Sequence, residues 1–336
     1  MLKCVGQAII LLSIGRKVLS VIESIVILPH GDFAFDPTLV PAESQAAGVA
    51  WKLFHAAHHV GRLVGNTDPD LIFLSTPHGI SLANDFGVYM GDAAAGSAWI
   101  GKDLMDRTEV TPYRTELNIS LDRSASEKIL SYLSDENVTE INSIQSSVVP
   151  LYWGEVIPLS FVDVVNSEAP SMMKRGRLLN HVVWSHPLRR FNQSTTMVTE
   201  LLRVGRRLAK LLESLNERVV VLVSGDLSHT HRDDGPYGYS SASADFDLAV
   251  AEWADDPCCN QYALLQKARR LQQRALSCGF VGLVMAHGML GCQSTCCHRS
   301  QFVSRLWAWG NVTYYGMMVA SLTRSLVPTQ DIAVSS

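Results

Sequence analysis

The sequence lacks any long apolar run, any low-complexity linker, any internal repeat and any run of like charges. A helix that crosses a bilayer needs about 20 apolar residues, whereas the apolar run at residues 9–14 is short and is followed by Arg16 and Lys17. No small-x-small cleavage site follows it, so we interpret residues 1–22 as an N-terminal extension. We therefore expect no membrane partner.

Charge and cysteine usage exclude further classes of protein. The formal net charge is −4, from 28 basic and 32 acidic residues, so we expect a small ligand and no nucleic-acid partner. The seven cysteines show no framework spacing, although four form the pairs Cys258-Cys259 and Cys296-Cys297. This pattern favours reduced thiols in the cytoplasm over a disulfide scaffold. The motif Cys292-x-x-x-Cys296-Cys297-His298 has the composition of a zinc cluster but no second ligand pair at finger spacing, and we expect a surface loop there.

Three short apolar runs each end in small or polar residues and a histidine. Residues 219–224 are followed by Gly-Asp-Leu-Ser-His229, and the runs before His30 and His78 both end in Pro-His-Gly. Short β-branched runs closed by Gly or Pro indicate strands that are buried on both faces of a parallel or mixed sheet. Ligands bind beyond the carboxyl ends of such strands. If the three strands are neighbours, their histidines meet at one edge of the sheet.

The rest of the pattern predicts an α/β fold, with a single domain whose central mixed sheet is flanked by helices on both faces. Residues 23–326 form this domain in our interpretation, and residues 327–336 form a C-terminal tail. We expect the strands before His30 and His78 to belong to one β-α-β unit and to pair directly. Apolar residues at helical spacing predict helices at residues 41–64, 124–133, 195–215, 244–254, 261–274 and 279–290. We also expect a hairpin or irregular excursion at 84–101, a strand and bend at 148–162, and edge strands at 302–309 and 312–319.

The chemistry-bearing residues suggest a metal site. Neutral imidazoles are common transition-metal ligands, so His30 and His78 make half of such a site. The candidates for a third ligand are Asp32, Asp226, Glu155 and Cys278. Cys278 stands just before a predicted helix that begins at Gly279, where a helix N-terminus favours the thiolate form. A packing role for this cysteine stays open.

Other candidates surround this set. We assign His229, the nearer of two histidines to its strand, as an acid/base group, and we expect His231 to lie in an outer loop. Three arginines are candidates for binding a substrate carboxylate, although a solvated arginine is the alternative for each: Arg114, Arg189 and Arg190.

Five motifs follow one another along the chain: Pro-His30-Gly-Asp, Ser75-Thr-Pro-His78-Gly, Gly154-Glu-Val-Ile-Pro-Leu159, Ser224-Gly-Asp-Leu-Ser-His229 and Ser277-Cys278-Gly. In this order the chain resembles the class III extradiol ring-cleavage dioxygenases over most of its length. That superfamily includes the catalytic subunit of protocatechuate 4,5-dioxygenase, the plant DOPA dioxygenases and the related Memo proteins. The resemblance implies an α/β fold with a mixed sheet, a non-haem Fe(II) and O₂-dependent opening of a catechol ring.

The resemblance also implies roles for residues. The histidines that match His30 and His78 bind the iron, and the one that matches His229 acts on substrate protons. Cys278 stands where the dioxygenases usually carry a glutamate, as it does in Memo-type proteins. At the bend before Pro-Leu, Tyr152-Trp153-Gly154 replaces the usual Asp-His-Gly.

Two functions follow as hypotheses. The first is a ring-cleaving dioxygenase with metal ligands His30, His78 and Cys278, acid/base residue His229, and a small aromatic diol and O₂ as substrates. The second is a Memo-like metal- or redox-binding protein without ring cleavage, and a metal-dependent hydrolase is a more distant third. Fe(II) is the expected metal, with Zn(II) or copper as alternatives because a thiolate is a soft ligand. The assembly state stays open, a homo-oligomer included.

Overall fold

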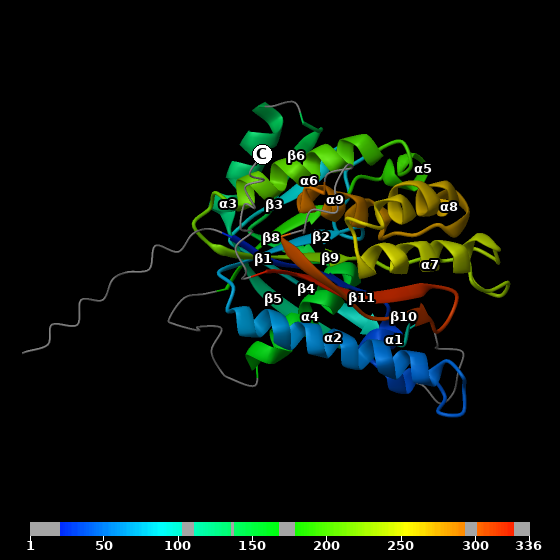
Figure 1. The fold of residues 1–336 in the computed structure, drawn as a ribbon. Coiled ribbons are helices and arrows are strands. Elements are labelled where there is room, and N and C mark those ends of the chain that lie inside the picture. Colours follow the sequence, from blue (N-terminus) through cyan, green and yellow to red (C-terminus); the bar gives the residue numbers. More distant parts are fainter. Residues whose placement is uncertain (1–20, 103–110, 136–137, 168–178, 293–300, 326–336) are drawn as a thin grey trace, which may run out of the picture.

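A mixed sheet of eleven strands runs through the molecule in the computed structural model (Figure 1). The structure describes residues 21–102, 111–135, 138–167, 179–292 and 301–325. The predicted N-terminal extension, most of the cysteine motif at 292–298 and the predicted C-terminal tail therefore lie almost entirely outside the described residues. No helix in the described part is long and apolar enough to cross a membrane.

The central strands of the sheet are parallel. Along the sheet the order is β10-β11-β1-β9-β2-β8-β5-β4-β7, and β3 and β6 extend it from β8. The strands are β1 (Val21–Leu28), β2 (Leu71–Thr76), β3 (Phe86–Met90), β4 (Ala93–Ile100), β5 (Tyr113–Leu121), β6 (Ile141–Gln145), β7 (Val148–Leu151), β8 (Asn180–Ser185), β9 (Arg218–Ser224), β10 (Phe302–Asn311) and β11 (Gly316–Arg324). The expected α/β class with a mixed sheet is confirmed.

The expected direct pairing of β1 with β2 is wrong, because β9 lies between them. Val221 on β9 is in register with Ile25 on one side and with Phe73 on the other. The apolar strand β9 thus takes a position where both of its edges are paired and both of its faces are buried. This insertion places the ends of β1, β9 and β2 next to one another.

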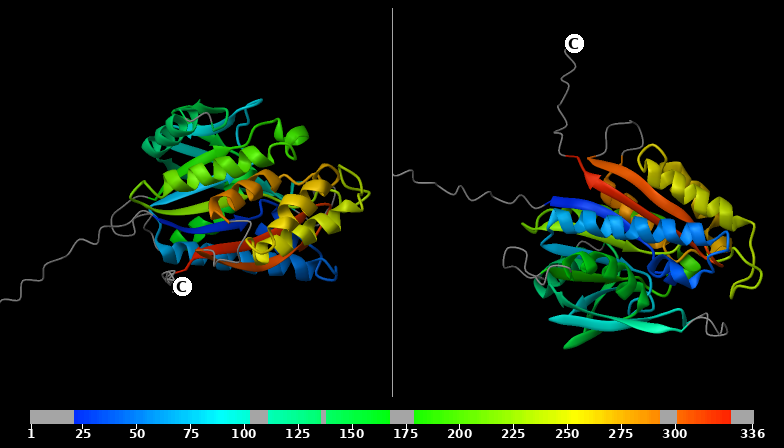
Figure 2. Two further views of the ribbon diagram at one scale, coloured as in Figure 1. Left: turned by 45° about the horizontal axis from the view of Figure 1, so that its top comes forward. Right: turned by 90° about the horizontal axis from the view of Figure 1, so that it is seen from below.

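Helices cover both faces of the sheet (Figure 2). Alternate residues of β9 enter opposite cores, with Val219, Val221 and Val223 on one side and Val220 and Leu222 on the other. The first core is closed by α3 (Arg123–Asp135), α6 (Val198–Leu212), α7 (Ala242–Asp255), the π-helical turn η4 (Ala263–Ala268) with α8 (Arg269–Ala275), and α9 (Phe280–Leu290). The second is closed by α1 (Asp32–Phe35), the short turn η1 (Pro37–Leu39), α2 (Ala47–Thr67) and α4 (Trp153–Ser167). A further short helix, α5 (Arg190–Gln193), follows β8.

Two segments differ from the sequence expectation. Residues 148–162 are a short strand followed by helix α4, which continues through Pro158. Residues 84–101 form two separate strands, of which β4 pairs with β5, a strand that the sequence did not predict because most of its side chains are at least partly exposed. Of the two expected edge strands only β10 lies at the edge, since β11 pairs with β1.

The expectation of reduced thiols is also wrong for two cysteines. Cys258 and Cys292 form a disulfide across 34 residues of sequence, with their Cα atoms 5.2 Å apart. The bond joins the segment after α7 to the end of α9, and both helices pack into the same core. Spacing along the chain could not show that these two helix ends meet.

Candidate metal centre

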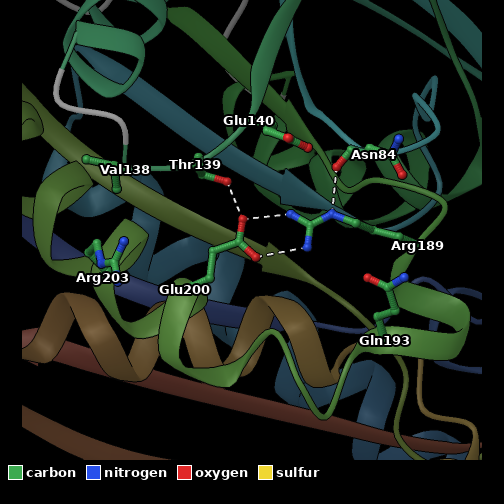
Figure 3. Close-up of a pocket in the computed structure, with 8 residues that line it drawn as sticks. All are labelled: Asn84, Val138, Thr139, Glu140, Arg189, Gln193, Glu200 and Arg203. Carbon is green, nitrogen blue, oxygen red and sulfur yellow. Dashed lines mark hydrogen bonds and ion pairs between the residues drawn. The ribbon is translucent and has the colours of Figure 1, made fainter.

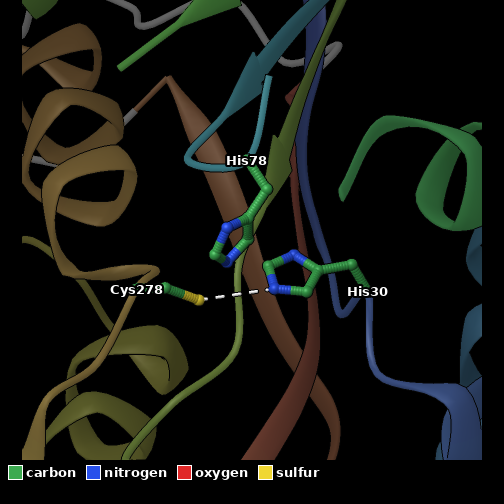
Figure 4. A group of neighbouring side chains, drawn as sticks. All are labelled: His30, His78 and Cys278. Carbon is green, nitrogen blue, oxygen red and sulfur yellow. Dashed lines mark hydrogen bonds between the residues drawn. The ribbon is translucent and has the colours of Figure 1, made fainter. Parts of the chain in front are cut away.

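His30 and His78 meet at the carboxyl ends of two parallel strands that flank β9. His30 follows β1, His78 follows β2, and the end of β9 lies between them. Their ring centroids are 4.7 Å apart with an interplanar angle of 87°. His30 is buried and His78 is half-buried. The structure therefore brings the two predicted strand-end histidines together (Figure 4).

Cys278 completes a group of three ligand-type side chains. It lies in the turn before α9, and its Sγ is 3.4 Å from His30 Nε2. One ligand atom from each of His30, His78 and Cys278 lies within 4.8 Å of the other two. Two imidazoles and a thiolate at such separations can coordinate one divalent transition metal after small adjustments.

Ser224, at the end of β9, fixes which nitrogen of His30 faces this group. The Ser224 hydroxyl donates its proton to the carbonyl of Gly154 at 2.6 Å. Its oxygen therefore accepts from His30 Nδ1, which lies 2.9 Å away. With Nδ1 protonated, the lone pair is on Nε2, the nitrogen that faces Cys278. His30 is thus oriented for a metal by a hydroxyl behind it.

The Gly154 carbonyl is available because of Pro158. In an α-helix the carbonyl of residue 154 accepts from the N–H of residue 158, and proline has none. The carbonyl in α4 therefore accepts from Ser224 and from Thr76 Oγ1, the latter at 3.2 Å. Thr76 Oγ1 in turn accepts from the backbone N–H of His78. One carbonyl thereby supports both histidines.

Gly154 also has to be a glycine for steric reasons. A Cβ on it would lie 2.6 Å from the Cβ of His78. The neighbouring Trp153 ring lies 4.8 Å from the His78 ring, centroid to centroid, and is half-exposed. The close approach of α4 to His78 therefore gives the centre an aromatic side.

Asp226 supports the opposite side of the group. Its Oδ1 accepts from the His30 backbone N–H at 3.2 Å, and its Oδ2 lies 3.3 Å from His30 Nε2. Its backbone N–H donates to Cys278 Sγ at 3.3 Å. Burial raises the pKa of Asp226 to about 8 and lowers the pKa of His30 well below its ordinary value. The neutral forms of both side chains are therefore favoured.

The expected low-pKa thiolate at Cys278 is not what the protein alone favours. Burial, followed by the Asp226 carboxylate, raises the pKa of the Cys278 thiol above its ordinary value. The helix start is where the sequence placed it, but a partial dipole charge is outweighed by loss of solvent. A bound cation reverses this balance, because a coordinating thiol loses its proton.

The other proposed third ligands serve elsewhere. Asp32 accepts a hydrogen bond from the Gly101 backbone N–H. Glu155 accepts two hydrogen bonds, both of 2.6 Å, from the Tyr89 hydroxyl and from the Tyr152 backbone N–H. Burial raises the pKa of Glu155 to about 8. Glu155 therefore supports the chain around the centre from behind.

His229 is held in one tautomer by backbone carbonyls. Its Nδ1 lies 2.9 Å from the carbonyl of Leu276, which can only accept, so Nδ1 carries the proton and Nε2 the lone pair. Leu276 adopts a left-handed conformation with φ +56° and directly precedes the turn that carries Cys278. Burial lowers the pKa of His229 to about 4. A neutral imidazole with an unprotonated Nε2 is the form that a general base requires.

His231 does not lie free in an outer loop, as the sequence suggested. Its Nε2 pairs with the buried Asp247 at 2.7 Å, and Asp247 also accepts from the backbone N–H of Ser228. The pair thus anchors the chain on both sides of His229. Tyr237, Tyr314 and Tyr315 have ring centroids 6.0–6.2 Å from that of His229.

The three candidate arginines differ in burial and in their hydrogen-bond partners. Arg114 is exposed and bonds Ser97, while Arg189 forms two hydrogen bonds with Glu200. Arg189 and Glu200 line an open pocket of about 640 Å³ beside α6, outside the metal-ligand group (Figure 3). Arg190 is buried, and its charge lowers the pKa of His78, second only to burial. The sequence motifs contain Ser224, Thr76 and Gly154, but their pattern did not indicate that these residues support the two histidines.

Two histidines and a cysteine at the strand ends of an α/β sheet, beside a histidine in its basic form, define a protein class with a candidate non-haem metal centre. The chain belongs to the family described as the catalytic LigB subunit of aromatic ring-opening dioxygenase, whose model matches residues 26–315. It is also similar to the protein CA_C1420 of Clostridium acetobutylicum, with 27% identity over 231 residues. That match covers 66% of this chain and 42% of the relative, so the chain spans less than half of the relative's length.

Proposed function

We propose that this chain is a metal-dependent extradiol dioxygenase that opens a small aromatic diol with O₂, with His30, His78 and Cys278 as metal ligands. The observation that carries the proposal is His229, held as a neutral base beside the ligand group by the Leu276 carbonyl. Membership in the ring-opening dioxygenase family supports it. Fe(II) is the proposed native metal.

In this proposal His229 is the base and the Leu276 carbonyl orients it. His229 Nε2 accepts a proton from a diol hydroxyl, while Leu276 keeps Nδ1–H in place. Because burial disfavours the imidazolium, His229 readily passes that proton on. When bound, the metal supplies Lewis acidity and open coordination positions for the diol and O₂.

Aromatic side chains suit a planar substrate. Trp153 packs beside His78, and Tyr237 beside His229 with its side chain more than half exposed. Offset or edge-on contacts with such rings orient a flat molecule and exclude water around it. The replacement of a polar bend residue by Trp153 thus fits stacking of an aromatic ring.

Oxygen uptake tests the proposal. The protein is loaded with Fe(II) without air and mixed with a panel of catechols, and we expect O₂ consumption with a yellow ring-opened product. Absence of uptake across the panel would favour the Memo-like alternative. The observation that favours that alternative is the sulfur donor, Cys278, in the ligand group.

Substitutions separate the two kinds of histidine. His229→Ala should keep its metal and lose turnover by ~10²-fold or more, the usual scale for a positioned acid/base group. His78→Ala should lose the metal itself. Metal content by elemental analysis beside the turnover number checks both. Normal metal in His78→Ala together with poor metal in His229→Ala would reverse the assigned roles.

A further inference from the structure

Arg190 is the most buried arginine among the described residues, with 5% of its surface exposed. Three other partly buried arginines are paired with carboxylates: Arg189 with Glu200, Arg218 with Asp68 and Asp70, and Arg324 with Glu213. Arg190 has no such partner in the described part of the chain. Its Nη1 donates to the Pro187 carbonyl at 3.1 Å, and its Nε is buried without a hydrogen bond.

The chain places Arg190 beside the metal centre. The backbone N–H of His186 donates to the carbonyl of Thr76 at 3.0 Å, which holds the end of β8 against the end of β2. Arg190 follows four residues later, and its charge lowers the pKa of His78, second to burial, and that of His30 after burial, His78 and His229. Phe191 lies over the guanidinium at 4.1 Å from the ring centroid and is 68% exposed. The cation is thus near both imidazoles and close to the surface of the molecule.

A buried cation without a counter-charge is costly to keep. A guanidinium has five N–H groups in a planar fork that matches a carboxylate. Only one bond from that fork, to Pro187, is present among the described residues. An anion that enters with the ligand would complete the set.

We propose that Arg190 binds a carboxylate on the aromatic substrate and so determines how the ring lies against the metal centre. This inference rests on the proposed function for its substrate class, but the binding of the carboxylate needs no ring cleavage. The alternative is that the Cys278 thiolate is the counter-charge of Arg190, in which case the guanidinium serves the metal instead.

Binding of a matched pair of ligands tests the proposal. Protocatechuate and its uncharged amide share a catechol ring and differ in the carboxylate, and each is titrated by calorimetry into the zinc-loaded protein. We expect the wild type to bind protocatechuate at least about tenfold more tightly than the amide, the scale of a charge-assisted hydrogen-bonded pair. Arg190→Met should remove this preference and leave affinity for the amide unchanged. Arg190→Lys should keep part of it, because lysine retains the charge but not the fork.

Controls keep the proposal separate from folding and from catalysis. Arg206→Met removes an exposed arginine from α6 and should behave as the wild type. The thermal midpoint of Arg190→Met should not fall, since an unpaired buried charge is removed. Equal binding of both ligands by the wild type would overturn the inference, as would a loss of zinc affinity in Arg190→Met. If the protein takes up O₂ but binds protocatechuate and the amide equally, only the role of Arg190 is wrong. If it prefers the carboxylate but takes up no O₂, only the dioxygenase function is wrong.

Discussion

The two sides of the candidate metal centre hold the proposed ligands differently. The histidine side consists of His30, His78, Ser224, Thr76 and Gly154, in which hydroxyls and one carbonyl fix the ligand positions. The cysteine side consists of the Leu276–Gly279 turn with Asp226, in which Cys278 Sγ accepts from a backbone N–H. The first side presents the lone pair of His30 Nε2 without a metal, whereas the second presents a thiol that must lose a proton.

The histidine side is therefore ready for a metal before it binds, whereas the cysteine side changes its protonation state on binding. Neutral imidazoles in a fixed tautomer need no change of protonation when a metal binds. The Cys278 thiol has a raised pKa because of burial, so its proton is released only in exchange for the cation. We infer that the histidine side determines where a metal binds and the cysteine side adds affinity once the cation is present.

Among the substitutions that test this difference, removal of the Cys278 sulfur should have the largest effect on zinc affinity. Cys278→Ser should weaken zinc binding by an order of magnitude or more, because a hydroxyl is a poorer ligand than a thiolate. Zinc titration with a competing chelator measures it, and Cys259→Ser, a change of an exposed thiol, is the control. If Cys278 has a packing role instead, metal content should stay unchanged and the free energy of unfolding should fall by about 1 kcal/mol, seen as a lower thermal midpoint.

Ser224→Ala tests the histidine side without touching a ligand. The substitution frees His30 Nδ1 from its partner, so the ring can take either tautomer or rotate. Loss of such a supporting hydrogen bond typically costs 10–100-fold in metal affinity, and we expect about tenfold because Asp226 still holds the His30 backbone. Ser126→Ala is the matched control, because the hydroxyl of this buried serine on α3 has no hydrogen-bond partner among the described residues. Equal zinc affinity in both variants would contradict the role of Ser224.

The two sides also differ in how far the sequence predicts them. The Pro-His-Gly motifs and the apolar run of β9 carried enough signal to predict that His30, His78 and His229 follow buried strands, but not that β9 lies between β1 and β2. The segment around Gly154 was predicted as a strand and bend, whereas in the structure it begins α4, and Pro158 lies inside that helix and frees a carbonyl. Such a role depends on what lies across space from residue 154, which periodicity along the chain does not contain.

The sequence could not predict the raised pKa of Cys278 or the disulfide between Cys258 and Cys292, for the same reason. Burial outweighs the local helix-start signal at Cys278. The disulfide depends on the meeting of two helix ends that are 34 residues apart. Local sequence reports element type and strand ends, whereas charge state and cross-links depend on the packed interior.

Pro158→Ala should have a smaller effect than Ser224→Ala. Alanine restores an N–H that competes with the Ser224 hydroxyl for the Gly154 carbonyl, without removing that hydroxyl. We expect zinc affinity to fall by less than in Ser224→Ala while the thermal midpoint rises, since alanine favours helix over proline. A fall in the thermal midpoint with full zinc affinity would show that the proline serves packing alone.

The smallest expected effect lies behind the histidine side, at Glu155. Tyr89 donates to Glu155 and accepts from the backbone N–H of Ile80, so this carboxyl supports the chain after His78. Burial raises its pKa to about 8 from an ordinary value of 4.5, so between these values the folded protein binds the proton that the unfolded chain releases. The free energy of unfolding therefore falls as pH rises through this window, and Glu155→Gln should remove that part of the slope. Chemical denaturation of the metal-free wild type and variant at several pH values measures it, with Glu43→Gln, at an exposed glutamate, as the control for lost charge. If Glu155→Gln kept the wild-type slope, the carboxyl would be ionised in the folded state, and the support behind His78 would be a charged one.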